Sequence, residues 1–100
     1  MVETYTLLDV AEEIEEKTAK ILKVLGDPNR IKIVQLLAKG EMCQCEIIPI
    51  LGQSQPTVSR HLNLLVEKGI LVSRRDGVKI LYRIANPAVS KIIESATSLI

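Results

Sequence analysis

Apolar residues recur at intervals of three and four along residues 10–25, and this spacing predicts an amphipathic helix. Asp9 is a candidate N-cap for that helix, and Gly26 ends the pattern. The apolar side of the predicted helix is made of Val10, Ile14, Ile21, Val24 and Leu25.

A second helix is predicted to start immediately, with Asp27 as its N-cap and Pro28 at its first helical position. It stops at Gly40. A short third helix is predicted at about residues 46–51, and Gly52 ends it.

The next segment predicts a fourth helix with a sharp division between its two faces. Ser54 can cap it, Pro56 falls in its first turn, and Gly69 terminates it. Small polar groups and an arginine occupy its front, whereas its back carries Val58, Leu62, Leu65 and Val66.

Two short strands are predicted at residues 70–74 and 79–84, joined through Asp76-Gly77, which is a strong hairpin signal. A last helix is expected after Asn86-Pro87. Its apolar set is Val89, Ile92, Ile93, Ala96 and Leu99.

This order predicts one domain over residues 1–100, mainly α, with an α+β winged-helix fold: five helices and a two-stranded β-hairpin wing. Residues 45–68 form the predicted helix-turn-helix, and residues 70–84 the wing. In such a unit the fourth helix enters the major groove of double-stranded DNA.

Candidate DNA contacts lie at the front of the fourth helix and on the wing. A glutamine can pair with adenine and an arginine with guanine, while basic wing residues meet phosphates. Ser54 is expected to act first as a cap, and His61 to lie on the helix surface or contact the DNA backbone rather than to bind a metal. The full candidate set is Ser54, Gln55, Thr57, Ser59, Arg60, His61, Arg74, Arg75 and Lys79.

The charge distribution supports this interface. The whole chain has a net charge of only +1. Residues 1–26 carry six acids against three lysines, whereas residues 53–83 carry six basic residues against two acids. A basic segment that coincides with the predicted groove-binding helix and wing is typical of phosphate binding.

Composition narrows the class of protein further. There is no Trp or Phe, so the core must be aliphatic, and the surplus of aliphatic surface predicts a second copy of the chain as partner. No apolar run reaches the length of a membrane span and no signal peptide is evident, so we expect a cytoplasmic protein. A single His and no phosphate-cradling loop argue against an enzyme.

The chain resembles the ArsR/SmtB family of metal- and metalloid-responsive repressors. Four stretches carry the likeness, in the family's order and spacing: residues 25–31, 41–47, 54–62 and 69–72. The resemblance implies a homodimeric winged-helix repressor that releases operator DNA when an inducer binds. It also implies that residues 1–25 and 87–100 form the dimer interface.

The resemblance also points to the inducer site. The family's zinc-type site uses His and acidic residues of the last helix, but residues 87–100 contain no His and only Glu94 as an acid. Cys43 and Cys45 match the family's cysteine site at the start of the third helix, while the position of a frequent third cysteine holds Ile48. Arsenite or antimonite is therefore the favoured inducer, with no constitutive cofactor.

Two thiolates separated by one residue suit a thiophilic ion. A trivalent organoarsenical already has one bond to carbon, so two cysteines suffice for it. On a regular helix, side chains two residues apart point about 200° apart, so Cys43 and Cys45 would not meet on one ion. Pro49 has no N–H for the carbonyl of Cys45, which weakens helix there. We expect ion binding to fix a non-helical turn and displace the third helix against the fourth.

Three other interpretations of the cysteines remain open at this stage. They can be small, half-buried residues with no sensing role, since buried free cysteine is common. They can respond to oxidants or persulfides, although in a reducing compartment a ligand pair is favoured over a structural disulfide. The chain can also be a DNA-binding protein with no inducer.

Overall fold

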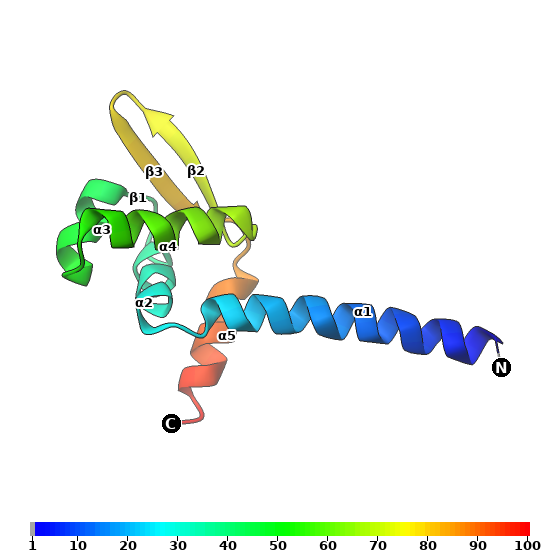
Figure 1. Ribbon diagram of the computed structural model, residues 1–100. Helices are drawn as coiled ribbons and strands as arrows, with labels where there is room; N and C mark the ends of the chain where they lie inside the picture. The colour runs from blue at the N-terminus through cyan, green and yellow to red at the C-terminus, as the bar shows by residue number, and fades with distance from the viewer. Residues whose placement is uncertain (1) are drawn as a thin grey trace.

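The computed structural model of the protein describes the backbone of residues 2–100 and the side chains of residues 13–100. Its elements confirm the mainly α winged-helix fold with a hairpin wing (Figure 1). In chain order they are α1 (Val2–Leu25), α2 (Pro28–Leu37), β1 (Met42–Cys43), α3 (Gln44–Leu51), α4 (Gln55–Glu67), β2 (Leu71–Asp76), β3 (Lys79–Ile84) and α5 (Ala88–Thr97).

Helix α1 is longer than the sequence pattern predicted. It begins at Val2, so Asp9 lies inside the helix and is not its N-cap. Residues 2–8 contain no Gly or Pro to interrupt the helix. The side chain of Val10 lies outside the described residues. Helix α1 projects from the body of the molecule (Figure 1), and its buried side chains in the described part are Val24 and Leu25, at its last turn.

The cap of α2 is confirmed. The Asp27 side chain accepts hydrogen bonds from the backbone N–H groups of Asn29, at 3.0 Å, and Arg30, at 3.1 Å. Pro28 occupies the first helical position, where its missing N–H costs nothing. This short connection fixes where α2 begins relative to the end of α1.

The sheet contains a strand that the sequence did not predict. Strands β2 and β3 form the predicted antiparallel hairpin, with Asp76 paired to Lys79 next to the turn. Strand β1 then pairs antiparallel with β3, matching Met42 with Tyr82 and Cys43 with Leu81, so the strand order is β1-β3-β2. Two residues are too few to show an alternating pattern, which is why sequence reasoning missed β1.

One aliphatic core joins the helices to the base of the sheet. Tyr82 is the aromatic residue in this core, with 4% of its surface exposed, as expected from its place on the second wing strand. Among the described residues, no helix combines the length and apolarity needed to cross a bilayer. The core consists of Val24, Leu25, Ile33, Val34, Leu37, Ile47, Leu51, Val58, Leu62, Leu65, Ile70, Leu71, Tyr82, Val89 and Ile93.

Candidate nucleic-acid interface and thiol pair

A tight turn sets α4 against α3. Gly52 adopts φ +66°, a left-handed conformation that glycine adopts without strain, and it ends α3. Ser54 then caps α4 from an extended conformation, and its Oγ accepts the backbone N–H of Thr57 at 3.4 Å. The predicted cap and helix-turn-helix geometry are therefore both present.

The two faces of α4 differ as the sequence predicted. Val58, Leu62 and Leu65 have no exposed surface. Gln55 and Arg60 are exposed on the free side of the helix. Both can therefore reach a base edge or a phosphate without any rearrangement of the core.

Three other candidate residues of α4 are half-buried: Thr57, Ser59 and His61. The Oγ atoms of Ser54 and Thr57 lie 2.9 Å apart at the first turn. Nδ1 of His61 lies 3.3 Å from Nη1 of Arg30, whose Nε donates to the carbonyl of Val24. This contact ties the middle of α4 to the junction between α1 and α2.

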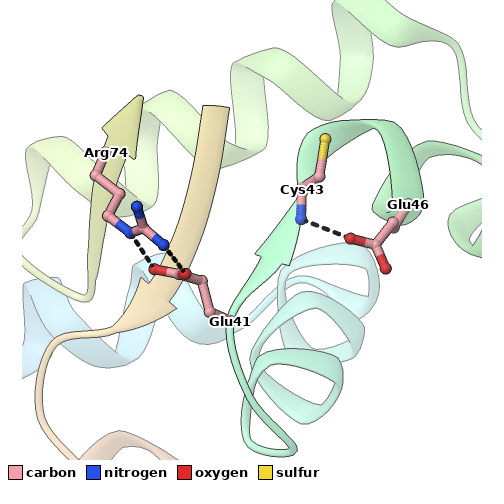
Figure 2. A network of polar contacts seen from close by, with 4 residues as sticks. All are labelled: Glu41, Cys43, Glu46 and Arg74. Atoms are coloured by element: carbon pink, nitrogen blue, oxygen red, sulfur yellow. Dashed lines mark hydrogen bonds and ion pairs between the residues drawn. The ribbon is translucent and has the colours of Figure 1, made fainter. Parts of the chain in front are cut away.

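The wing presents basic side chains to solvent. Arg75 and Lys79 are exposed on paired strands next to the turn at Gly77. Arg74 instead forms a two-point ion pair with Glu41, just before β1, at 2.9 and 2.7 Å (Figure 2). Of the three predicted wing contacts, Arg74 thus already has a protein partner.

The ion pair changes the titration of both groups. The hydrogen bond from Arg74 lowers the pKa of Glu41, and the same contact raises the pKa of Arg74. Because the pKa of Glu41 is lowered on folding, its ion pair stabilises the fold above the ordinary carboxyl range. That contribution is lost as the pH falls through the lowered pKa.

Cys43 caps α3, a role usually taken by Ser, Thr, Asp or Asn. Its backbone is extended, with φ −74° and ψ 148°, and its sulfur accepts the backbone N–H of Cys45 at 3.1 Å. Glu46 completes a capping box, because its Oε1 accepts the backbone N–H of Cys43 at 3.1 Å (Figure 2). The first cysteine is therefore non-helical, as we expected, but Cys45 lies within the helix.

The extended backbone at Cys43 places its sulfur next to residue 45. The two sulfurs can therefore meet, which they could not do on a regular helix. In the structure Cys43 and Cys45 are joined by a disulfide, whereas the sequence favoured a reduced ligand pair. Cys43 is 3% exposed and Cys45 is exposed. Among the described residues, no group of three or more His, Cys, Asp or Glu side chains lies close enough to hold a metal ion.

Gln44, between the two cysteines, links this segment to α4 and to the wing. Its Nε2 donates to Oγ of Ser59 on α4, and its Oε1 accepts from the hydroxyl of Tyr82 on β3 at 3.4 Å. Burial raises the pKa of Tyr82, so the phenol keeps its proton at neutral pH and remains a donor. Sequence reasoning missed Gln44 because its partners lie 15 and 38 residues away.

A helix with a buried apolar back and a free polar front, beside a basic hairpin, defines a winged helix-turn-helix DNA-binding protein. Comparisons with known proteins agree. The sequence profile of the bacterial regulatory proteins of the arsR family matches residues 27–73. An uncharacterised HTH-type transcriptional regulator of Methanocaldococcus jannaschii is 45% identical over 85 residues, covering 84% of this chain and 96% of that protein.

Two further relatives extend the comparison. The arsenical resistance operon repressor of Escherichia coli K12 is 44% identical over 81 residues, covering 77% of this chain and 69% of the repressor. The homodimeric winged helix-turn-helix DNA-binding domain of a possible ArsR-family regulator from Mycobacterium bovis superposes with a TM-score of 0.78. It is 28% identical, covering 88% of this chain and 82% of that chain. The chain belongs to the ArsR family of bacterial regulatory proteins, and it is a DNA-binding transcriptional regulator, not an enzyme.

The Glu41–Arg74 pair leads to a prediction about DNA affinity. Replacing Glu41→Gln removes a negative charge beside the wing and frees the guanidinium of Arg74 for a phosphate. We expect tighter binding to DNA of any sequence at low salt, and a plot of log K against log salt steeper by up to about 1. Fluorescence anisotropy across a salt series measures both. An unchanged slope would show that Arg74 does not reach the DNA backbone.

Proposed function

We propose that this chain acts as a homodimeric operator-binding repressor, released from DNA when arsenite or antimonite binds Cys43 and Cys45. One observation carries the proposal. The thiol pair is connected directly to both DNA-binding elements, through Gln44 to α4 and through the β1–β3 pairing to the wing. The name of the E. coli relative, an arsenical resistance operon repressor, supports the choice of inducer.

Arsenite binding at this turn changes no oxidation state, and each bond that forms replaces one that breaks. Arsenite, As(OH)3, forms two As–S bonds with the two thiols, two As–O bonds break, and two water molecules leave. The third position keeps a hydroxide or takes another small ligand. The reaction needs the dithiol form of the pair, so the disulfide seen in the structure must first be reduced.

The mechanism follows from where the new bonds form. Cys43 is the last residue of β1 and also the cap of α3, and this cap is intact in the disulfide-bonded form. An arsenic atom inserted between the two sulfurs changes the geometry of the cap. Rearranging that cap shifts Gln44, and with it the contacts to Ser59 and Tyr82. The inducer then acts through its different affinity for the two arrangements of this turn.

The dimer rests on apolar surface that the single chain leaves uncovered. Figure 1 shows α1 extending away from the body, and in its described part only the last turn joins the core. The homodimeric M. bovis domain supports a dimer. We place its interface on residues 1–25 and 87–100. Such a regulator works in the cytoplasm beside the DNA it binds. Within the described part of these two segments, the large exposed apolar side chains are Ile14, Ile21, Leu22, Ile92, Leu99 and Ile100.

For the DNA contacts, we propose that Gln55 and Arg60 read base edges, while Arg75 and Lys79 bind phosphates. Ser54 and Thr57 lie with Gln55 at the first turn of α4. Ser59, His61 and Arg74 have the protein partners described above.

Arg60→Ala should then weaken operator binding by about 10-fold to 100-fold, but weaken binding to random DNA much less. Arg75→Ala is the matched control, because loss of a phosphate contact should weaken both kinds of DNA alike and flatten the salt dependence. Competition gel shifts against bulk DNA measure the two effects. Equal losses on both DNAs for Arg60→Ala would contradict base reading by this residue.

The double substitution Cys43→Ser and Cys45→Ser tests the inducer site. Serine is a good N-cap, so it keeps the capping box while it removes both thiols. We expect operator affinity to stay close to that of the unsubstituted protein, and release by arsenite or antimonite to disappear. Anisotropy titrations of the reduced protein on an operator fragment check both. A full response from the double variant would refute the site.

The disulfide favours a second candidate function, a repressor that responds to oxidants. Hydrogen peroxide takes two electrons from the two thiols, a disulfide forms, and both thiol protons leave in water. The same titration with peroxide separates the two candidates. Release by peroxide with no response of the reduced protein to arsenite would assign the oxidant function instead.

Gln44→Ala tests the proposed connection. The variant should still bind the inducer, but the ratio of operator affinities without and with inducer should fall about fivefold, as expected for losing contacts worth roughly 1 kcal/mol. Gln35→Ala is a matched control, because Gln35 is exposed on α2, away from the thiol pair. A ratio equal to that of the unsubstituted protein would place the connection elsewhere, such as in the β1–β3 pairing.

A further inference from the structure

His61 is the single histidine of the chain, and it lies in the middle of α4 with a half-buried side chain. Its Nδ1 is 3.3 Å from Nη1 of Arg30, in the first turn of α2. A guanidinium only donates hydrogen bonds, so Nδ1 has to be the acceptor. The contact therefore requires the neutral imidazole, with its proton on Nε2.

Arg30 makes a second contact, at the last turn of α1. Its Nε donates to the backbone carbonyl of Val24, a buried residue. In a continuous helix this carbonyl would accept the N–H of residue 28, but that residue is Pro28 and has no N–H. One guanidinium therefore satisfies a free carbonyl at the end of α1 and reaches the middle of α4.

The charged groups on the neighbouring elements are placed elsewhere. Asp27 and Glu46 accept backbone N–H groups at the N-termini of α2 and α3. The charges of β2 lie at residues 74–76, beside the hairpin turn. On α4 itself, Arg60 and Glu67 are exposed. Among the described residues, no carboxylate forms an ion pair or hydrogen bond with the imidazole, so the guanidinium is its charged partner.

Protonation of the imidazole would place two cations in contact. A protonated Nδ1 is a donor, so it can no longer accept a hydrogen bond from the guanidinium. A histidine side chain ordinarily changes its charge between about pH 5 and pH 8. The link between α1 and α4 should therefore be lost as the pH falls through this range, while the uncharged buried face of α4 stays packed.

We propose that Arg30 is a positioning residue, which holds α4 against the end of α1 while His61 is neutral and releases it when His61 is protonated. The proposal rests on the dimer proposed above, in which α1 belongs to the interface. A dimer reads two half-sites at a fixed spacing. The link from α1 to α4 then sets the distance between the two recognition helices, although Arg30 itself reads no base.

The first test measures operator affinity of the reduced protein by fluorescence anisotropy as the pH is lowered. Between about pH 8 and about pH 5.5 we expect the affinity to fall about tenfold. His61→Asn is the matched control, because its Oδ1 takes the position of Nδ1 but cannot be protonated. This variant should bind like the unsubstituted protein at the higher pH and show a much smaller fall.

Two outcomes of this pH series would overturn the inference. An equal fall for His61→Asn would show that another group titrates. Tighter binding of the unsubstituted protein at low pH would show that protonated His61 contacts a phosphate instead of releasing α4.

The second test uses Arg30→Lys, which keeps the positive charge but loses the planar fork that reaches two acceptors at once. We expect weaker operator binding at about pH 8, by about fivefold, and a nearly flat pH profile. Lys32→Arg is the matched control, because Lys32 is an exposed cation of the same helix; it should leave both the affinity and the profile unchanged.

Half-site spacing distinguishes positioning of α4 from a general loss of stability. Inserting one base pair between the half-sites should weaken binding of the unsubstituted protein strongly, but weaken binding of Arg30→Lys much less. A variant that was only less stable would keep the preference of the unsubstituted protein, and that result would contradict the inference. The proposed dimer fails separately, if sedimentation shows a monomer on the operator; the comparison with His61→Asn still decides whether the link to Arg30 exists.

Discussion

The position of α4 depends on one constraint: its apolar face must be fully buried while the opposite face stays free of protein. Val58, Leu62 and Leu65 meet the first half of this constraint, with no exposed surface. A rotation of α4 by one residue, about 100°, would bring polar side chains into the core, at a cost of about 1–3 kcal/mol for each unpaired group. Core packing therefore determines which side chains of α4 face the DNA.

The polar contacts around α4 act on a smaller energy scale. A buried Leu or Val side chain contributes about 1.5–3 kcal/mol, whereas an average hydrogen bond contributes about 1 kcal/mol net. The contacts of Ser59 with Gln44 and of His61 with Arg30 lie at the edges of the helix and are half-buried. Breaking one of them can shift α4 slightly without exposing the core, and an allosteric coupling of about 1–3 kcal/mol requires no more.

Local signals were sufficient to predict most of the fold. Asp27 and Ser54 cap their helices as expected, and the predicted hairpin forms, with its turn at Gly77 and Val78 directly after Asp76. Each of these depends on neighbours within a few residues in the sequence. The start of α1 was wrong because a cap residue also fits inside a helix, and β1 was missed because two residues form no pattern.

Only part of the candidate site could be predicted from the sequence, because the sequence shows local signals and not distant contacts. The exposed residues and the cysteine pair could be selected from residue type and spacing. The sequence could not show which candidates already have protein partners, because those partners are distant in the chain. Glu41 is 33 residues from Arg74, and Arg30 is 31 residues from His61. Cys43 as a helix cap was overlooked because cysteine is not a usual capping residue, although the Glu46 of a capping box was in place.

Cys43 is both the last residue of β1 and the N-cap of α3. The arsenite and oxidant proposals therefore involve the same residue. As the cap of α3, its sulfur accepts the backbone N–H of Cys45 at the N-terminus of the helix. That hydrogen bond is present together with the Cys43–Cys45 disulfide, so the cap tolerates this bond at the sulfur. Because Cys43 also belongs to β1, a rearrangement of this turn reaches β3. The proposals of arsenite binding and of oxidation therefore involve the same turn, which contacts both α4 and β3.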